Sequence, residues 1–209
     1  MGKKQIRKEE TYEVIPVGMR IIGGEFGGRK IAYAGDRRVR PMKDRVREAI
    51  FNLIHMRVKD SYIIDLFGGT GALALESLSR GAKAATICEQ HFPTARVITD
   101  NVKLLNVEAR VCVRPGDVFL WNKRNPVLPQ DIPWTVFCCP PYRFFQERTQ
   151  DVYDLLESLI RRAPDKSLFV VEADTQFNWM EFNVLGEWEI HAYPPAVVGF
   201  LNRRLNEKE

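Results

Sequence analysis

Four consecutive residues, Cys139, Pro140, Pro141 and Tyr142, have the clearest chemical potential in this sequence. They follow the apolar run 136–138, and the prolines end that run because proline lacks an N–H donor and has a fixed φ. We therefore expect the chain to leave a buried strand as a rigid, extended corner. Such a corner can point the Pro140 carbonyl, the side chain of residue 139 and the Tyr142 ring at a ligand.

These groups suit the transfer of a methyl group to an amino nitrogen. The exocyclic amine of a nucleic-acid base is a poor nucleophile because its lone pair is delocalised into the ring. Acceptors that bind both amine hydrogens orient the lone pair and stabilise the positive charge that develops on nitrogen. The Pro140 carbonyl and the residue-139 side chain are candidate acceptors, and the Tyr142 ring offers a face on which the base can stack.

A glycine-rich segment at 65–71 lies where a predicted strand turns into a predicted helix. Ligands bind at this position in open α/β sheets, and glycine lets them approach the backbone. Residues 69–74 also satisfy the G-x-G-x-x-A pattern of dinucleotide binding, so the segment indicates an adenosine-bearing cofactor without identifying it. A glycine turn needed only for packing is the alternative. The candidate cofactor-binding residues in this segment are Asp65, Phe67, Gly68, Gly69, Thr70 and Gly71.

Two acidic residues after later strands extend this candidate site. Glu89 ends the next predicted strand, from which its carboxylate can hydrogen-bond a ribose. Asp117 follows the third strand, where its carboxylate could accept a hydrogen bond from an adenine amino group. The pair Gly116-Asp117 is also typical of a simple turn, so this assignment has a structural alternative.

The charge distribution separates the first 60 residues from the rest. The chain has 209 residues and a net charge of +4; residues 1–60 contain 15 Lys and Arg against 8 Asp and Glu, and the remainder contains 16 against 19. A basic N-terminal part is expected to face a polyanion, and a solvated basic surface is the alternative. Because there is no apolar run of about 18 residues and no charged-then-apolar leader, we expect neither a membrane span nor a signal peptide, and a cytoplasmic location.

The cysteines give no indication of a metal site or a disulfide. None of the four has CxxC spacing, and each falls in or at the end of a β-like run. We therefore expect buried free thiols at Cys88, Cys112, Cys138 and Cys139.

The segments that must position these residues alternate between short apolar runs and helical patterns. Such alternation predicts right-handed βαβ crossovers and a parallel sheet covered by helices on both faces. Two final runs, 188–192 and 197–201, are joined by so short a link that an antiparallel pair is expected. The other strands are predicted at 62–66, 84–89, 109–113, 135–138 and 168–173, and helices at 72–80, 93–105 and 151–162.

An N-terminal extension precedes this alternating region. Residues 20–22 and 29–33 flank a glycine-rich turn at 23–28 and predict a hairpin. The spacing of apolar residues predicts a helix over 43–57. The predicted organisation is a charged tail at 1–17, a hairpin and helix at 18–60, and an α/β domain at 61–205.

With these elements in place, the chain resembles a known family: bacterial methyltransferases that modify guanine N2 in small-subunit ribosomal RNA and use S-adenosylmethionine. The likeness runs from about Met19 to Phe200, and its most specific block is 40–52, which generic methyltransferases lack. The blocks that carry it are Met19 to Gly24 with Gly28-Arg29-Lys30, Arg40-Pro41 with Asp44 to Ala49 and Phe51-Asn52, Asp65 to Phe67 through Gly71 to Leu73 and Glu76, Ser79 to Ala82, and Pro140-Pro141-Tyr142.

The resemblance implies a class I, Rossmann-like methyltransferase fold with a seven-stranded, mostly parallel sheet and an added N-terminal β-hairpin and helix that helps to hold RNA. It assigns the methionine moiety of the cofactor to residues 65–71, the ribose to Glu89 and the adenine to the neighbourhood of Asp117. The implied partner is ribosomal RNA or the small ribosomal subunit, and the chain is expected to be a monomer. The basic residues expected to face RNA are Arg20, Arg29, Lys30, Arg40, Lys43, Arg45 and Arg47.

One position departs from the family pattern. Where the family has Asp, and related amino-methyltransferases Asp or Asn, before Pro-Pro-Tyr, this chain has Cys139. A thiol is a weak hydrogen-bond acceptor. By analogy with the loss of one oxyanion-hole donor, the change could cost about 3 kcal/mol, or roughly a hundredfold in rate. The ending at 193–200 also differs from the glycine-containing ending usual in the family.

Three interpretations of Cys139 are open. The thiol is tolerated because the Pro140 carbonyl and a neighbouring group suffice, or the chain binds cofactor and RNA without efficient catalysis, or a thiolate itself serves. A thiolate is disfavoured because an apolar setting raises a thiol's pKa. The predicted function is therefore guanine-N2 methyl transfer slowed by Cys139. The alternatives are a catalytically impaired binding paralogue and an amino-methyltransferase with a DNA or protein acceptor.

Overall fold

The computed structural model describes residues 19–33, 35 and 41–203. The predicted tail at 1–17 and Arg40 lie outside the described residues. Within these ranges, no helix combines the length and apolar character needed to cross a bilayer.

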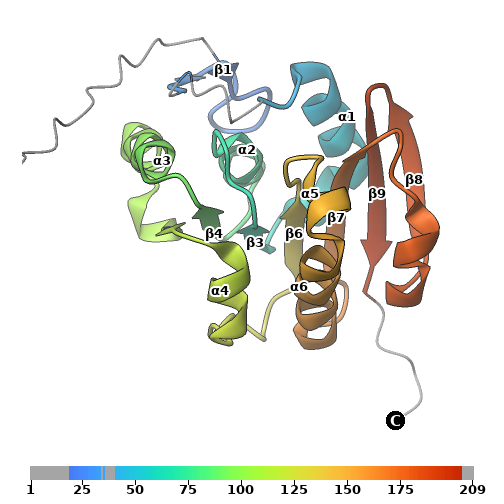
Figure 1. Cartoon of the computed structure of the whole chain (residues 1–209). Coiled ribbons are helices and arrows are strands. Elements are labelled where there is room, and N and C mark those ends of the chain that lie inside the picture. The colour runs from blue at the N-terminus through green and yellow to red at the C-terminus, as the bar shows by residue number, and fades with distance from the viewer. Residues whose placement is uncertain (1–18, 34, 36–40, 204–209) are drawn as a thin grey trace, which may run out of the picture.

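The centre of the fold is a seven-stranded sheet with the strand order β5-β4-β3-β6-β7-β9-β8 (Figure 1). Neighbouring strands from β5 to β7 pair in parallel, whereas β9 runs antiparallel to β7 and β8. Both the mostly parallel sheet and the antiparallel final pair are thereby confirmed. The strands are β3 (Tyr62–Asp65), β4 (Ala84–Glu89), β5 (Val111–Pro115), β6 (Trp134–Cys138), β7 (Leu168–Asp174), β8 (Trp188–Tyr193) and β9 (Ala196–Asn202).

Helices cover both faces of this sheet (Figure 1). One core packs α1, α2 and α3 on the sheet, and a second packs α4, α5, α6 and η3 on the opposite face. The central strands are mostly apolar because neither face meets solvent; all five residues of β6 are buried. The helical segments are α1 (Asp44–Ile54), η1 (His55–Val58), α2 (Ala72–Ser79), α3 (Phe92–Leu104), η2 (Glu108–Arg110), α4 (Val118–Lys123), α5 (Phe144–Glu147), α6 (Thr149–Arg162) and η3 (Trp179–Leu185).

Some short elements differ from the sequence-based expectation. The segments α4, α5 and η3 were not predicted, and η2 delays the start of β5 from 109 to 111. The helix predicted over 43–57 is an α-helix only to Ile54, after which η1 continues as a tighter 3-10 turn. The boundary differences fall at the ends of elements, where hydrogen bonding outside the local sequence decides the limit. The three missed segments have six, four and seven residues, which is too short for a clear periodic pattern.

The N-terminal extension forms the predicted hairpin, in which β1 (Met19–Arg20) pairs antiparallel with β2 (Lys30–Ile31). It docks on α2, where the buried carboxylate of Glu76 accepts hydrogen bonds from Ile22 N at 2.6 Å and Gly23 N at 2.9 Å. Gly24 has φ +78°, and a Cβ there would lie 2.0 Å from the Ser79 carbonyl oxygen. Only glycine therefore allows the hairpin to approach α2 so closely.

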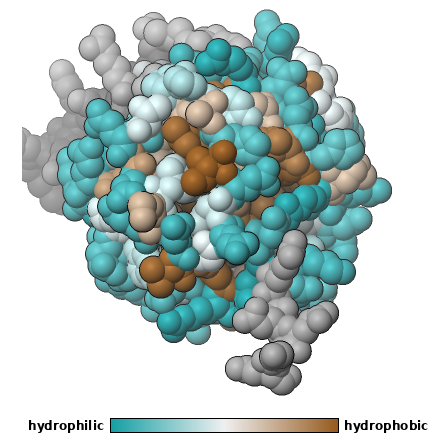
Figure 2. Space-filling model, turned by 90° about the vertical axis from the view of Figure 1, so that its right-hand side faces the viewer, coloured by the Kyte–Doolittle hydropathy of each residue, from teal (hydrophilic) through white to brown (hydrophobic). Residues whose placement is uncertain are grey.

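The surface on the side of α1 and β8 has no broad apolar area. Figure 2 shows apolar side chains in separate areas bordered by polar ones on this face. Leu53 on α1 and Ile190 on β8 are among the partly exposed apolar residues of the described chain. Scattered exposure of this kind is ordinary for protein surfaces.

Candidate active site

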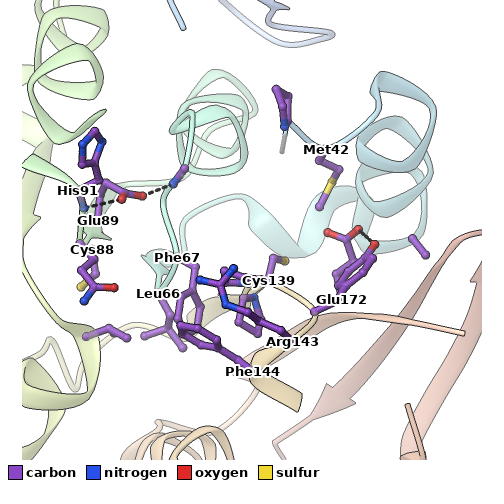
Figure 3. Close-up of a pocket in the computed structure, with 18 of the residues that line it drawn as sticks. Met42, Leu66, Phe67, Cys88, Glu89, His91, Cys139, Arg143, Phe144 and Glu172 are labelled. Carbon is purple, nitrogen blue, oxygen red and sulfur yellow. Dashed lines mark hydrogen bonds between the residues drawn. The ribbon is translucent and has the colours of Figure 1, made fainter. Parts of the chain in front are cut away.

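The carboxyl ends of β3, β4, β6 and β7 border a cavity of about 490 Å³ (Figure 3). It lies at the topological switch point of the sheet, where the chain, after running outward from β3 to β4 and β5, returns to place β6 on the other side of β3. The cavity brings together residues that are far apart in the sequence. The predicted site residues that line it are Lys43, Phe67, Gly69, Glu89, Asp117, Cys139, Pro140, Pro141 and Tyr142.

The remaining residues of the glycine-rich loop support the cavity from behind. Asp65, Gly68, Thr70 and Gly71 are not among its lining residues. A Cβ on Gly68 would lie 2.5 Å from Ile87 Cγ2, so this glycine is required for packing against β4. The packing interpretation therefore holds for part of the loop, while Gly69 faces the cavity.

Asp65 is a buried carboxylate at the end of β3. It is 1% exposed, and neither carboxylate oxygen has a hydrogen bond of ordinary geometry to a described residue. Burial and, second, the nearby Glu89 carboxylate raise the pKa of Asp65 from 3.8 to about 7. A poorly satisfied buried carboxylate next to a binding cavity is typical of functional sites.

Glu89 holds the end of β4 and the glycine-rich loop together. Its Oε2 accepts a hydrogen bond from Gly69 N at 2.8 Å, and its Oε1 accepts one from His91 N at 2.8 Å (Figure 3). A carboxylate has about four lone-pair sites, and Glu89 lines the cavity where ribose hydroxyls can donate to it. The Gly69 N–H is thus used to orient Glu89.

Asp117 caps α4 and also faces the cavity. Its Oδ1 accepts hydrogen bonds from Phe119 N at 2.7 Å and Leu120 N at 3.2 Å. Its Oδ2 lies 3.9 Å from Arg148 Nη1. The predicted turn is therefore a helix cap, and the carboxylate remains on the wall where an adenine amino group can reach it.

Three aromatic rings complete this end of the cavity: Phe67, which was a predicted cofactor-binding residue, and Phe119 and Phe144, which the sequence did not indicate. Phe67 lies 6.0 Å from Phe119 and 6.1 Å from Phe144 between ring centroids, edge to face in both pairs. The guanidinium of Arg148 lies 4.0 Å over the Phe119 ring. The adenine end is therefore apolar with an acidic edge, which suits a flat purine carrying an amino group.

The proline corner forms the opposite end of the cavity. The Tyr142 hydroxyl donates a hydrogen bond to Glu172 Oε1 at 2.8 Å, so the ring has a defined position (Figure 3). Burial and, second, the Glu172 carboxylate raise the pKa of Cys139 well above its ordinary value. The thiol therefore stays protonated at neutral pH, which argues against the thiolate interpretation.

All four cysteines are free thiols, as expected. Cys88 and Cys138 are buried, whereas Cys112 and Cys139 are only partly so. Among the four, Cys88 and Cys139 line the cavity.

The basic residues of the extension differ in their exposure. Arg20, Arg29, Lys30, Lys43 and Arg45 are exposed, although Arg29 donates a hydrogen bond to Leu104 O at 2.6 Å and Arg45 donates one to Pro194 O at 3.3 Å. Of these exposed residues, Lys43 lines the cavity.

Arg47 is a correction to the predicted RNA-facing set. Its side chain is 0% exposed, donates to Arg20 O at 2.6 Å and pairs with Asp44 at 3.1 Å. The hairpin covers this flank of α1, which the spacing of apolar residues within the helix could not reveal. Arg47 therefore fastens β1 to α1 and has no surface for a phosphate.

Glu172 is the functional candidate that sequence reasoning missed. It lines the cavity beside Cys139 and holds Tyr142. The signal was a single acidic residue within the apolar run Leu168 to Ala173, where only a buried strand was predicted.

The residues present fit an adenosine cofactor that carries a methyl group. The cavity offers a carboxylate for ribose hydroxyls at Glu89, an apolar wall with an acidic edge near Asp117, and an acceptor-rich corner at Pro140. S-adenosylmethionine, when bound, supplies an electrophilic methyl carbon attached to a sulfonium. The chain's own groups then bind the ribose and adenine and orient an amino acceptor at the corner.

Comparisons with known proteins agree with this geometry. A family profile described as Conserved hypothetical protein 95 matches residues 19–193. The Escherichia coli K12 protein named Ribosomal RNA small subunit methyltransferase D is 34% identical over 192 residues, which is 91% of this chain and 90% of that protein. The solved structure of yhhF from Escherichia coli is 26% identical with a TM-score of 0.70, and covers 90% of this chain and 98% of its own.

A more distant structure shares the fold. An RNA methyltransferase from Salinibacter ruber in complex with S-adenosyl-L-homocysteine has a TM-score of 0.57 at 14% identity, and covers 81% of this chain and 97% of its own. The predicted class I, Rossmann-like fold is confirmed by these similarities.

Proposed function

The chain belongs to the family of ribosomal RNA small subunit methyltransferase D, whose members use S-adenosylmethionine, and we propose that it methylates the exocyclic N2 of a guanine in small-subunit ribosomal RNA. The observation that carries this proposal is the shared cavity. One cavity is lined both by residues on the proposed cofactor side, Gly69 and Glu89, and by the corner from Pro140 to Tyr142. Donor and acceptor can therefore meet without a large movement of the chain.

Each end of the cavity has a separate role in this proposal. The loop 65–71, Glu89 and Asp117 hold the cofactor, and the Pro140 carbonyl accepts a hydrogen bond from the target amine. Tyr142 stacks on the base, which must leave its own stack to reach the ring. A cytoplasmic location and a monomeric state are part of the same proposal.

The test is transfer of labelled methyl from S-adenosylmethionine to small ribosomal subunits that lack their own methylation, with mass spectrometry of the product nucleoside. N2-methylguanosine is the expected product. Another methylated nucleoside, or methylated DNA or protein, would replace the proposed acceptor. No transfer to subunits that an active family member methylates, with cofactor still bound, would instead favour a binding paralogue.

Replacing Cys139 by aspartate is expected to raise kcat for this reaction by about tenfold, the equivalent of one charge-assisted hydrogen bond. The reason is that a protonated thiol accepts a hydrogen bond weakly, whereas a carboxylate accepts strongly. Single-turnover methylation by wild type and Cys139→Asp measures the difference. Cys139→Ser, which introduces a polar hydroxyl of similar size without a charge, is the control; Cys88→Asp is not useful because Cys88 is buried. An unchanged or lower rate in Cys139→Asp would contradict the acceptor argument.

Replacing Lys43 by alanine is expected to weaken RNA binding and to lower the slope of log K against log salt by about one. Lys43 is exposed at the start of α1 and lines the cavity, so its ammonium can neutralise one phosphate near the target base. Fluorescence titrations of a ribosomal RNA fragment at several salt concentrations measure the slope. Arg161→Ala on α6, where the side chain is 74% exposed, is the matched control and should leave the slope unchanged. Equal slopes for wild type and Lys43→Ala would remove Lys43 from the RNA-binding set.

A further inference from the structure

We propose that Glu172 supplies the carboxylate that accepts hydrogen bonds from the target guanine, and so takes over the acceptor role that Cys139 cannot fill. The inference rests on the proposed function and names a further catalytic residue for it.

Strand register places Glu172 beside Cys139. In the parallel pair β6–β7, Cys138 is opposite Val171, so the next residues, Cys139 just after β6 and Glu172 near the end of β7, lie side by side. Successive residues of a strand alternate between faces, and matched positions share a face. Both side chains line the cavity, and Figure 3 shows them on the same side of it.

The hydrogen bond to Tyr142 fixes the Glu172 side chain toward the base site. Tyr142 Oη donates to Glu172 Oε1 at 2.8 Å. This contact orients Glu172, and a carboxylate can accept up to about four hydrogen bonds, so an oriented Glu172 can also accept from a base. A base stacked on the Tyr142 ring would have its edge next to the carboxylate.

The charge pattern at this corner favours Glu172 over Cys139 as the acceptor. Cys139 is a neutral thiol there, and the adjacent Glu172 carboxylate is one reason for this. The carboxylate is thus the stronger acceptor of the two side chains. A hydrogen bond to it strengthens as positive charge develops on the amine, which is the condition for catalysis rather than mere binding.

A carboxylate in this position also discriminates between bases. Guanine presents its N1–H and N2–H groups side by side, so one carboxylate can accept from both. Adenine presents its amino group beside N1, which is an acceptor with a lone pair, and this lone pair would face the negative carboxylate. Glu172 therefore selects guanine both by attraction and by repulsion of adenine.

The bonding changes are those of a direct displacement. The N2 lone pair forms a bond to the methyl carbon while the carbon–sulfur bond breaks and its electron pair stays on sulfur. The positive charge passes from sulfur to nitrogen. The nitrogen then gives up one proton, which Glu172 accepts and passes to solvent, so the carboxylate is restored.

The test compares Glu172→Gln with wild type in the methylation assay. The amide still accepts a bond from Tyr142 but has lost the charge, and its NH₂ group is a donor toward guanine. We expect kcat to fall by about a hundredfold while the cofactor Kd and the thermal midpoint stay unchanged. Glu187→Gln, the same change at an exposed residue of the described chain, should leave kcat unchanged.

Two further variants separate direct action from positioning. If Glu172 contacts the base, Tyr142→Phe, which keeps the ring but removes the hydroxyl, should lower kcat by less than about tenfold. In the Cys139→Asp background, the loss caused by Glu172→Gln should also shrink below about tenfold, because a second carboxylate is then present.

The outcomes are distinguishable. Equal kcat for Glu172→Gln and wild type, or equal losses in Tyr142→Phe and Glu172→Gln with no further loss when they are combined, would overturn the role of Glu172. A wild type that becomes active only as Cys139→Asp would also overturn it. Transfer to a different acceptor by wild type would instead overturn the proposed function.

Discussion

Replacing Glu76 by alanine is expected to lower the free energy of unfolding by about 3 to 5 kcal/mol, the cost typical of breaking a buried ion pair. Glu76 is 0% exposed and accepts three hydrogen bonds, from Ile22 N, Gly23 N and Arg80 Nε, the last at 2.8 Å. Alanine would leave two hairpin N–H groups and a guanidinium without this partner. Urea unfolding monitored by circular dichroism measures the loss.

A surface glutamate provides the matched control. Glu147 pairs with Arg143 at 3.6 Å, and both side chains are more than half exposed. Glu147→Ala should change stability by less than about 1 kcal/mol because exposed pairs contribute little. Glu76→Gln keeps one acceptor oxygen, so its loss of stability should lie between those of Glu76→Ala and Glu147→Ala. Similar losses in Glu76→Ala and Glu147→Ala would show that the carboxylate does not hold the hairpin.

The Glu76 contacts also connect the N-terminal extension, which we propose faces RNA, to the helix that follows the proposed cofactor loop. The helix α2 that carries Glu76 begins immediately after Gly71, the last residue of that loop. Displacing the hairpin would therefore act on α2 as well as on the basic surface. We expect Glu76→Gln to weaken RNA binding, although Glu76 is not one of the residues that line the cavity.

The sheet was predictable because each of its central strands is apolar and bounded by polar or glycine-rich turns. The strand Ala84–Glu89 has the predicted limits. The helix α4 was missed because it has six residues and is started by Asp117, whose side-chain cap reads in sequence as an ordinary turn. A short helix of this kind depends on its cap and its packing rather than on periodicity.

The sequence predicted those candidate site residues that belong to a local motif at a corner of the backbone. It did not predict those that become neighbours only when two strands pair. Cys139 to Tyr142 could be recognised from the prolines alone. Glu172 became a candidate only when strand register placed it beside Cys139. Arg47 shows the same limit, since its burial depends on β1, which is 27 residues away in the sequence.

The second large expected effect comes from Asp65. We expect the free energy of unfolding to fall as pH rises from about 4 to about 7. The pKa of Asp65 is raised from 3.8 to about 7 by burial and by Glu89. Below pH 3.8 both the folded and unfolded states hold the proton, and the burial cost is absent. Between the two values only the folded state holds it, so unfolding releases a proton and is favoured by higher pH. Above pH 7 the carboxyl is ionised in both states, and the loss of stability is complete.

The variant Asp65→Asn should remove this pH dependence, because the amide does not titrate. A difference of about three pKa units corresponds to about 4 kcal/mol, so the stability difference between wild type and variant should change by up to that amount between pH 4 and pH 8. Comparing the two pH values cancels any constant cost of burying the amide. Asp131→Asn, at an exposed position, is the control and should show no such change.

The same substitution should weaken cofactor binding, because a negative charge at Asp65 attracts a cationic ligand and the amide does not. We therefore expect S-adenosylmethionine to raise the thermal midpoint of wild type more than that of Asp65→Asn at pH 8. A carboxylate that costs stability at neutral pH would then be retained for binding, a trade-off common at functional sites. If the cofactor raised both midpoints equally while the pH dependence still disappeared, Asp65 would have a structural cost without a role in binding.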